Sequence, residues 1–249
     1  MTKQQKKWVR LAGCAALLCG TVPAAGAMHI MEGFLPPAAC VLWGAAALPF
    51  VLMGCFSLKK AAARDRHAVT LAAMAGAFIF VISSLKIPSA TGSCSHMTGT
   101  GLGAILFGPA AVSVLGVLVL LFQALLLAHG GLTTLGANVC SMAVAGPLVA
   151  FGVYQLCLRC RVHRRLAVFL AAALGDLATY CVTSVQLAVA YPSATGGVAA
   201  SAVKFLGVFA PTQLPLAVLE GALTVMILIA LENYAQPELR AVGFWEVDA

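Results

Sequence analysis

The feature that most constrains the fold is a set of long runs without charged side chains. Residues 37–58 contain no charge over 22 positions, and residues 101–128 contain none over 28. A helix needs about 20 apolar residues to cross a bilayer core roughly 30 Å thick. The whole chain is 61% hydrophobic and 9% charged, and its mean hydropathy is +0.99. The sequence therefore predicts an all-α, polytopic protein embedded in a lipid bilayer.

Two clusters of basic residues predict which ends of the helices face the cytoplasm. Lysine and arginine are enriched in short cytoplasmic loops, so each cluster marks a cytoplasmic end. The loops at residues 88–101 and 129–131 then lie outside, and the C-terminus lies in the cytoplasm. The net charge of +7 needs no nucleic-acid partner, because the basic residues stand where topology requires them. The clusters are Lys59, Lys60, Arg64 and Arg66, followed by Arg159, Arg161, Arg164 and Arg165.

The run at residues 101–128 joins two external loops, so it must cross the membrane an even number of times. At about 1.5 Å per residue it reaches only roughly 42 Å, too short for two full crossings. We expect a short or broken helix up to Gly108-Pro109 and a longer one from Ala110. Residues 201–209 are expected along the external surface, and residues 211–231 cross inward. The count is about seven membrane segments in a single domain, residues 28–249.

Residues 1–27 have the pattern of a cleaved signal peptide. A basic start with Lys3 and Arg10 precedes a short apolar stretch, and Ala25-Gly26-Ala27 reads as a cleavage site. A lipoprotein modification at Cys14 is disfavoured, because almost no apolar stretch precedes that cysteine. Retention of the segment as a membrane anchor is also disfavoured, because residues 11–22 are short for a spanning helix. Cleavage after Ala27 would leave Met28 as the external mature N-terminus.

A mature start at Met28-His29 would create a metal chelate. The free amine of Met28, the backbone nitrogen of His29 and its imidazole can close fused five- and six-membered rings around one ion. Late first-row ions such as cobalt, nickel and copper suit these nitrogen donors, whereas magnesium and calcium do not.

One further imidazole would complete a square of nitrogens, and topology selects the candidates. His96 and His129 lie in external loops, while His67 and His163 stand among the cytoplasmic basic residues. The Gly/Ser-rich loop around His96 can fold over a site. His129 sits at a helix end before two glycines, where capping is a sufficient role. We therefore favour His96 as the fourth ligand and keep His129 as the alternative.

Residues 28–36, with the sequence Met-His-Ile-Met-Glu-Gly-Phe-Leu-Pro, resemble the mature start of the CbiM family. These proteins are the cobalt-binding membrane subunits of energy-coupling-factor transporters. The similarity extends through four further blocks, at residues 95–99, 123–126, 129–138 and 211–221.

The resemblance implies a function, a ligand set and partners. It implies uptake of Co(II) into the cell for cobalamin biosynthesis, with cobalt as substrate, no other cofactor and no catalytic residue. The implied metal ligands are Met28, His29 and His96. The implied location is the cell (inner) membrane. The implied partners are the coupling subunit CbiQ, the ATPase CbiO and the small membrane subunit CbiN. Nickel relatives share the Met-His start but continue with a Pro-Asp-Gly-like turn, so Met31-Glu32-Gly33 favours cobalt over the nickel alternative.

Four other polar residues need an interpretation. Asn138 and Gln123 lie near the external face and are candidates to orient the ligands, because a metal-bound histidine usually donates its other N–H to an acceptor. His129 is the third candidate for that role. Asp176 and Glu220 are acids within membrane segments. They either line a metal path or form hydrogen bonds with neighbouring helices, and the second reading is favoured.

Two functions of other classes remain open: a membrane enzyme that uses the two acids as a pair, and a passive ion pore. The chain has no phosphate-binding Gly-x-x-x-x-Gly-Lys-Ser/Thr loop, so energy for uphill uptake must come from another chain.

Overall fold

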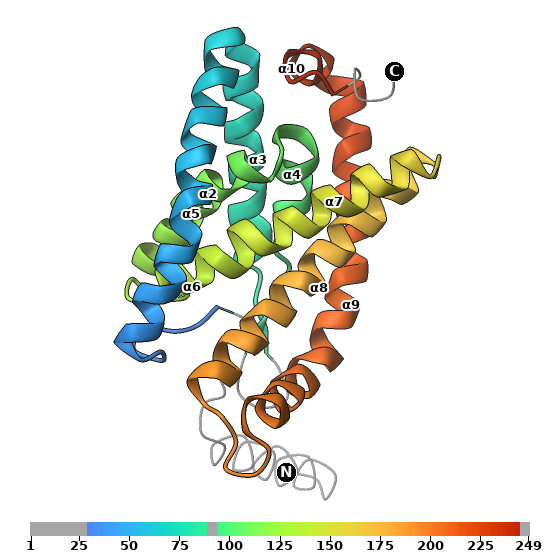
Figure 1. Ribbon diagram of the computed structural model, residues 1–249. Coiled ribbons are helices and arrows are strands. Elements are labelled where there is room, and N and C mark those ends of the chain that lie inside the picture. The colour runs from blue at the N-terminus through green and yellow to red at the C-terminus, as the bar shows by residue number, and fades with distance from the viewer. Residues whose placement is uncertain (1–28, 89–93, 245–249) are drawn as a thin grey trace, which may run out of the picture.

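The computed structural model describes residues 29–88 and 94–244, and they are almost entirely helical (Figure 1). The strands found among them, β1 (Ile87–Pro88) and β2 (Cys94–Ser95), form an antiparallel pair of two residues each. The prediction of an all-α membrane protein is confirmed. The predicted signal peptide, residues 1–27, and the predicted ligand Met28 lie outside the described residues.

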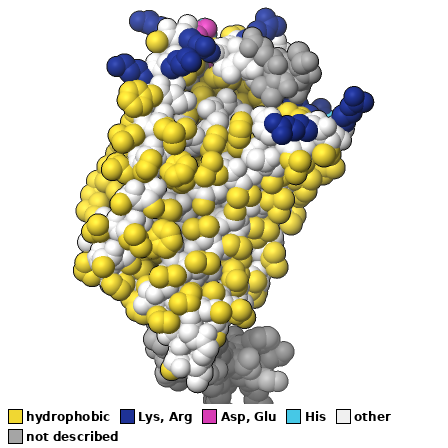
Figure 2. All heavy atoms as spheres, viewed as in Figure 1, with side chains coloured by type: hydrophobic (Ala, Val, Ile, Leu, Met, Phe, Trp, Pro, Cys, Tyr) yellow, Lys and Arg dark blue, Asp and Glu magenta, His cyan; other side chains and the backbone are white. Residues whose placement is uncertain are grey.

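Six helical segments among the described residues are long and apolar enough to cross a membrane. Hydrophobic side chains cover the flank of the molecule, and lysines and arginines gather at one end of it (Figure 2). This distribution is that of a multi-pass membrane protein. The segments are α2 (Pro37–Arg64), α3 (Arg66–Ser84), α5 (Pro109–Leu127), Leu135–Arg159, α8 (Arg164–Ala190) and α9 (Gly197–Tyr234).

A short helix, α4 (Thr100–Phe107), precedes α5, and the predicted break at Gly108-Pro109 is present. Gly108 has φ +80°, a conformation that disfavours residues with a side chain. Pro109 then starts α5, where its missing N–H costs no helical bond. Residues 100–106 of α4 are all buried, so protein covers this helix, which has only eight residues. That burial meets the requirement that broken backbone within a membrane protein be covered by the protein itself.

The segment Leu135–Arg159 contains an irregularity that the sequence pattern does not reveal. It consists of α6 (Leu135–Asn138), the π-helix η1 (Val139–Ala145) and α7 (Gly146–Arg159). π-Helical turns are rare and frequently stand at functional sites, because they shift the direction of the side chains that flank them. Asn138 is the last residue before this turn.

Helix α9 corrects one boundary of the sequence analysis. Residues 201–209 and 211–231 are joined in one helix of 38 residues, with Pro211 and Pro215 inside it. Proline removes one backbone hydrogen bond from a helix interior, but in membrane helices neighbouring groups can satisfy the freed carbonyl, so the helix continues.

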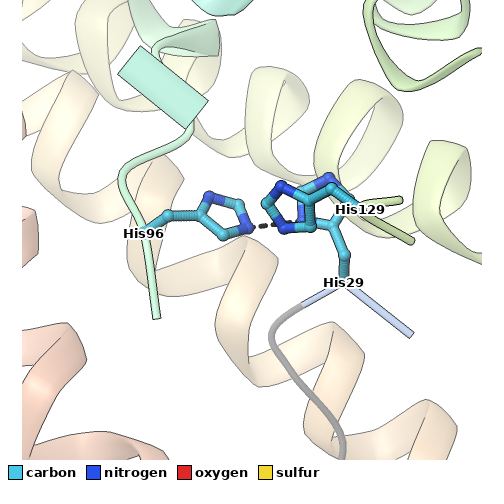
Figure 3. Close-up of side chains that lie close together, drawn as sticks. All are labelled: His29, His96 and His129. Atoms are coloured by element: carbon cyan, nitrogen blue, oxygen red, sulfur yellow. Dashed lines mark hydrogen bonds between the residues drawn. The ribbon is translucent and has the colours of Figure 1, made fainter. Parts of the chain in front are cut away.

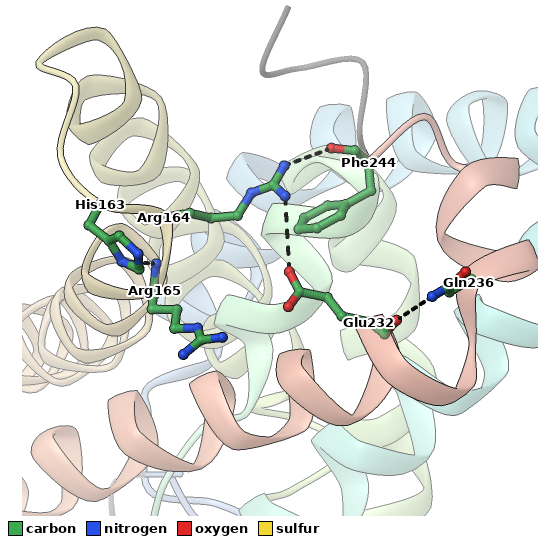
Figure 4. A network of polar contacts seen from close by, with 6 residues as sticks. All are labelled: His163, Arg164, Arg165, Glu232, Gln236 and Phe244. Atoms are coloured by element: carbon green, nitrogen blue, oxygen red, sulfur yellow. Dashed lines mark hydrogen bonds and ion pairs between the residues drawn. The ribbon is translucent and has the colours of Figure 1, made fainter.

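The basic end of the molecule is closed by contacts between α8, α9 and the C-terminal residues (Figure 4). Arg164 at the start of α8 donates to the carbonyl of Phe244 at 3.3 Å and lies 4.0 Å from the Glu232 carboxylate of α9. Its guanidinium also stacks 4.4 Å from the Phe244 ring centroid. His163 caps α8 by accepting from the Arg165 amide at 3.3 Å. The contacts of Arg164 hold Phe244, which follows α10 (Gln236–Ala241), beside the start of α8.

Helices α2 and α6 approach each other at a pair of glycines. A β-carbon added to Gly136 would lie 2.5 Å from the Cα of Gly44 and 2.8 Å from its nitrogen. These are backbone atoms, so they cannot rotate away as the end of a side chain can. The contact fixes α6, and with it Asn138, against α2.

We expect Gly136→Ala to lower the thermal unfolding midpoint of the detergent-solubilised protein, since overpacking typically costs about 1–3 kcal/mol. The matched control is Gly152→Ala in α7, where an added β-carbon meets no atom within 4 Å. That control should match or exceed the wild-type midpoint because alanine favours a helix. Equal midpoints for the two variants would show that the α2–α6 contact is not a constraint on packing.

Candidate metal centre

Three histidines from separate parts of the chain meet in one buried cluster (Figure 3). His29 precedes α2, His96 follows β2 and His129 follows α5. Their exposed fractions are 2%, 0% and 1%, and one ring nitrogen from each lies within 4.8 Å of the other two. The ring centroid of His29 is 4.4 Å from that of His96 and 4.4 Å from that of His129.

The ring nitrogens of His29 and His96 are oriented toward each other. His29 Nδ1 and His96 Nε2 are in direct hydrogen-bond contact. The other nitrogen of His96, Nδ1, donates a hydrogen bond to the carbonyl of Met97 at 2.8 Å, so the lone pair of this ring is on Nε2. Nδ1 is also the ring nitrogen of His29 that can close a six-membered chelate with the backbone nitrogen of the same residue.

Several buried nitrogens of the cluster have no hydrogen-bond partner within the described residues. They are His29 Nε2 and both ring nitrogens of His129. Buried polar atoms are nearly always paired, so unpaired ring nitrogens indicate a place where another group binds.

Burial keeps the three imidazoles neutral at pH 7. It lowers the pKa of His96 to about 4 and that of His129 to about 3. The pKa of His29 is lowered well below its usual range by burial and by the neighbouring His96 and His129. Neutral imidazole has one ring nitrogen with a free lone pair, and this is the form that binds a metal ion.

Asn138 holds the segment that carries His29. Its Oδ1 accepts from the amide of Ile30 at 2.8 Å, and its Nδ2 donates to the carbonyl of the same residue at 3.0 Å. The hydroxyl of Thr134 also donates to the Ile30 carbonyl, at 2.6 Å. The backbone immediately after His29 is therefore fixed to the start of the Leu135–Arg159 segment.

The turn after α5 places His129 against the same segment. The His129 amide donates to the carbonyl of Gln123 at 3.1 Å, and Gly130 follows with φ +80°. A β-carbon on Gly131 would lie 2.5 Å from the Cα of Glu32, so only glycine lets the turn approach this closely. Two adjacent glycines are thus required for His129 to reach the cluster.

The two amides proposed to orient the ligands are placed differently from expectation. Gln123 Nε2 donates to the Ser83 hydroxyl at 2.7 Å, and Asn138 binds the backbone of Ile30. Among the described residues, neither side chain is hydrogen-bonded to an imidazole. The carbonyl of Met97 fills that role for His96. A backbone carbonyl has no signature in the sequence, which is why sequence reasoning missed it.

The remaining histidines lie at the basic end of the molecule. His67 is the second residue of α3 and contacts Glu238 at 3.3 Å, and His163 caps α8. The two membrane acids, Asp176 and Glu220, are fully buried and form hydrogen bonds with protein groups, the reading favoured from the sequence.

Comparison with known proteins identifies the family. The profile described as "Cobalt uptake substrate-specific transmembrane region" matches residues 29–239. A protein of Lachnoclostridium phytofermentans named cobalt transport protein CbiM is 63% identical over 243 residues, which cover 98% of this chain and 97% of that protein. A protein of the same name from Chlorobium limicola is 62% identical, covering 89% and 87%.

Solved structures agree with this assignment. A crystal structure described as a truncated transition metal transporter superposes with a TM-score of 0.73 at 28% sequence identity. The match covers 83% of this chain and 99% of that one. The relatives are named as transport proteins rather than as enzymes. The chain therefore belongs to the CbiM family of cobalt uptake substrate-specific membrane proteins.

Proposed function

We propose that this chain captures Co(II) on the external face of the membrane as the substrate-binding subunit of an ATP-driven uptake transporter. The observation that carries the proposal is the buried contact between His29 Nδ1 and His96 Nε2. If the two rings moved slightly apart, both nitrogens could bind one ion at distances of about 2 Å each. Cobalt in this site is the substrate that the protein carries, not a resident cofactor.

The proposed ligand set is the amine of Met28, the backbone and imidazole nitrogens of His29, and the imidazole of His96. The orientation of His29 supports it, because the nitrogen that faces His96 is the one the chelate requires. The proposal needs cleavage of residues 1–27 as a signal peptide to free the amine. His129 lies beside this set, with its ring centroid 4.4 Å from that of His29, and Asn138 supports the set through Ile30. Gln123 supports it indirectly, through the backbone bond to His129.

Cobalt is preferred to nickel as the substrate. A nitrogen-only site suits both ions, so the donors alone do not separate them. The continuation Met31-Glu32-Gly33 and the printed names of the relatives, which are cobalt transport proteins, both favour cobalt. Nickel uptake by the same site is the second candidate.

Charge supports the proposed orientation in the membrane. His29 lies just before α2, and Lys59, Lys60 and Arg64 lie near the other end of that helix. If the basic end is cytoplasmic, as the distribution of lysine and arginine favours, the histidine cluster faces outward and the C-terminus inward. The short α4 and the six long segments would then make the seven membrane segments in the single domain of residues 28–249.

Energy for uptake would come from partner chains. We propose CbiO as the ATPase, CbiQ as the membrane coupling subunit and CbiN as the small membrane subunit, with the cobalt directed to cobalamin biosynthesis. The description of the family as substrate-specific supports a division of labour in which other subunits supply the energy. A passive pore or a membrane enzyme would need neither ATP nor the amino-terminal chelate.

An uptake assay distinguishes these functions. Cells that express this chain with the partner subunits should accumulate radioactive cobalt, and cells with an ATPase variant unable to hydrolyse ATP should not. Accumulation that persists without a functional ATPase would indicate a pore and contradict the proposal.

The mature N-terminus should begin at Met28 and be essential for tight binding. We expect mass spectrometry of the membrane-inserted protein to give a first residue of Met28. Adding one glycine before Met28 should abolish high-affinity Co(II) binding measured by calorimetry, because the α-amine is then moved away from the chelate. Equal affinity for the extended and the mature protein would eliminate the amine as a ligand.

Histidine substitutions should separate ligands from bystanders. His29→Ala and His96→Ala should each weaken Co(II) binding by more than the roughly 10–100-fold typical of losing an outer-shell partner. His67→Ala and His163→Ala are matched controls at the basic end and should bind like the wild type. Binding that survives His96→Ala but is lost in His129→Ala would transfer the fourth ligand to His129.

A further inference from the structure

The carboxylate of Glu220 binds the loop that follows His96. Glu220 lies in α9 and is 0% exposed. Its Oε2 accepts from the amide of Thr98 at 2.5 Å. Its Oε1 accepts from the Thr98 hydroxyl at 2.8 Å and from the Gly99 amide at 2.9 Å. One buried carboxylate thus satisfies three donors of a segment that has no helical hydrogen bonds of its own.

Two more residues of α9 bind the same loop. Gln213, seven residues before Glu220 and therefore on the same helix face, donates through Nε2 to the carbonyl of His96 at 3.2 Å. The same nitrogen lies 2.6 Å from Asp176 Oδ2 of α8. The hydroxyls of Ser95 and Thr212 are 2.7 Å apart. Residues 95, 96, 98 and 99 are therefore all bonded to α9.

The position of His96 consequently depends on α9, whereas that of His29 depends on Asn138 at the end of α6. The carbonyl of Met97 orients the His96 ring, and the adjacent Thr98 is the residue that Glu220 holds most closely. Among the described residues, Glu220 has no hydrogen bond to an imidazole. Its effect on the cluster therefore passes through the loop and through Asp176, which contacts Glu220 and binds the Gln213 nitrogen that donates to the His96 carbonyl.

We propose that Glu220 is the positioning residue of His96, which holds the loop so that Nε2 faces His29. The inference deepens the proposed function and depends on it, because it names the group that keeps one ligand in place. It also gives Glu220 a role that is distinct from lining a path for the metal through the membrane.

The amide variant is a sharp probe of this role. In Glu220→Gln, one oxygen becomes an NH₂ group that can only donate. In either orientation of the amide, that group faces the backbone N–H of Thr98 or of Gly99, so one buried donor loses its acceptor. A side chain of almost the same shape therefore cannot replace the carboxylate.

A milder pair of variants provides the matched comparison. Thr98→Val removes the hydroxyl that donates to Glu220 and that also lies 3.2 Å from the Thr100 hydroxyl. Thr224→Val removes a hydroxyl that is equally buried in α9, four residues after Glu220, and has no hydrogen-bond partner within the described residues. The two variants exchange the same atoms, but only the Thr98 hydroxyl contacts the carboxylate of Glu220.

The experiment measures Co(II) affinity by calorimetry and the number of nitrogen ligands by electron paramagnetic resonance of bound Cu(II), on the mature full-length protein in detergent. We expect Glu220→Gln to lose roughly 10–100-fold in affinity and to show one fewer nitrogen ligand. Thr98→Val should shift in the same direction by a smaller factor, and Thr224→Val should match the wild type. In a His96→Ala background, Glu220→Gln should cause no further loss, because its effect passes through His96.

Four outcomes would overturn the inference. Wild-type affinity and a wild-type spectrum in Glu220→Gln would show that Glu220 does not position His96. If that variant also lost uptake, Glu220 would belong to a transport path instead. A loss that persists undiminished in the His96→Ala background would show a general effect on the fold. If Glu220→Gln does not fold, equal affinities of Thr98→Val and Thr224→Val would refute the inference. Absence of Co(II) binding to the wild type would refute the proposed function itself, and the inference with it.

Discussion

Backbone that leaves a helix while it is buried in protein must find hydrogen-bond partners among protein groups, because an unpaired buried N–H or C=O group is costly. This constraint governs both halves of the histidine cluster. The segment around Ile30 is satisfied by the side chain of Asn138, and the segment of residues 96–99 is satisfied by Glu220 and Gln213. The polar side chains that bind these two segments are therefore explained by the irregular backbone that carries His29 and His96.

The two proposed ligands are anchored to different helices. His29 is fixed through α6, which packs against α2 at the Gly136–Gly44 contact, and His96 is fixed to α9. The relative position of α6 and α9 consequently sets the separation of the two imidazoles. A displacement of one helix relative to the other would therefore change that separation.

Much of the architecture could be predicted from composition and spacing alone. The uncharged runs gave the long membrane helices, and the short distance available to residues 101–128 required the break that the structure has at Gly108. Continuity of α9 through Pro211 was not predictable, because whether a proline ends a membrane helix depends on its neighbours. The π-helical turn at Val139–Ala145 was not predictable either, because its side chains are those of an ordinary apolar helix.

For the candidate site, the sequence by itself selected the histidines that the structure brings together. Spacing and topology selected His29, His96 and His129 and separated them from His67 and His163. Only the tertiary structure decided which side chains hold those donors in place. Asn138 binds the backbone of Ile30 rather than an imidazole, and Met97 contributes a carbonyl. Glu220 acts from a helix that is far from His96 in the sequence. Chelate chemistry is local and can be read from adjacent residues, whereas hydrogen-bond partners more than 100 residues apart are set by how the helices pack.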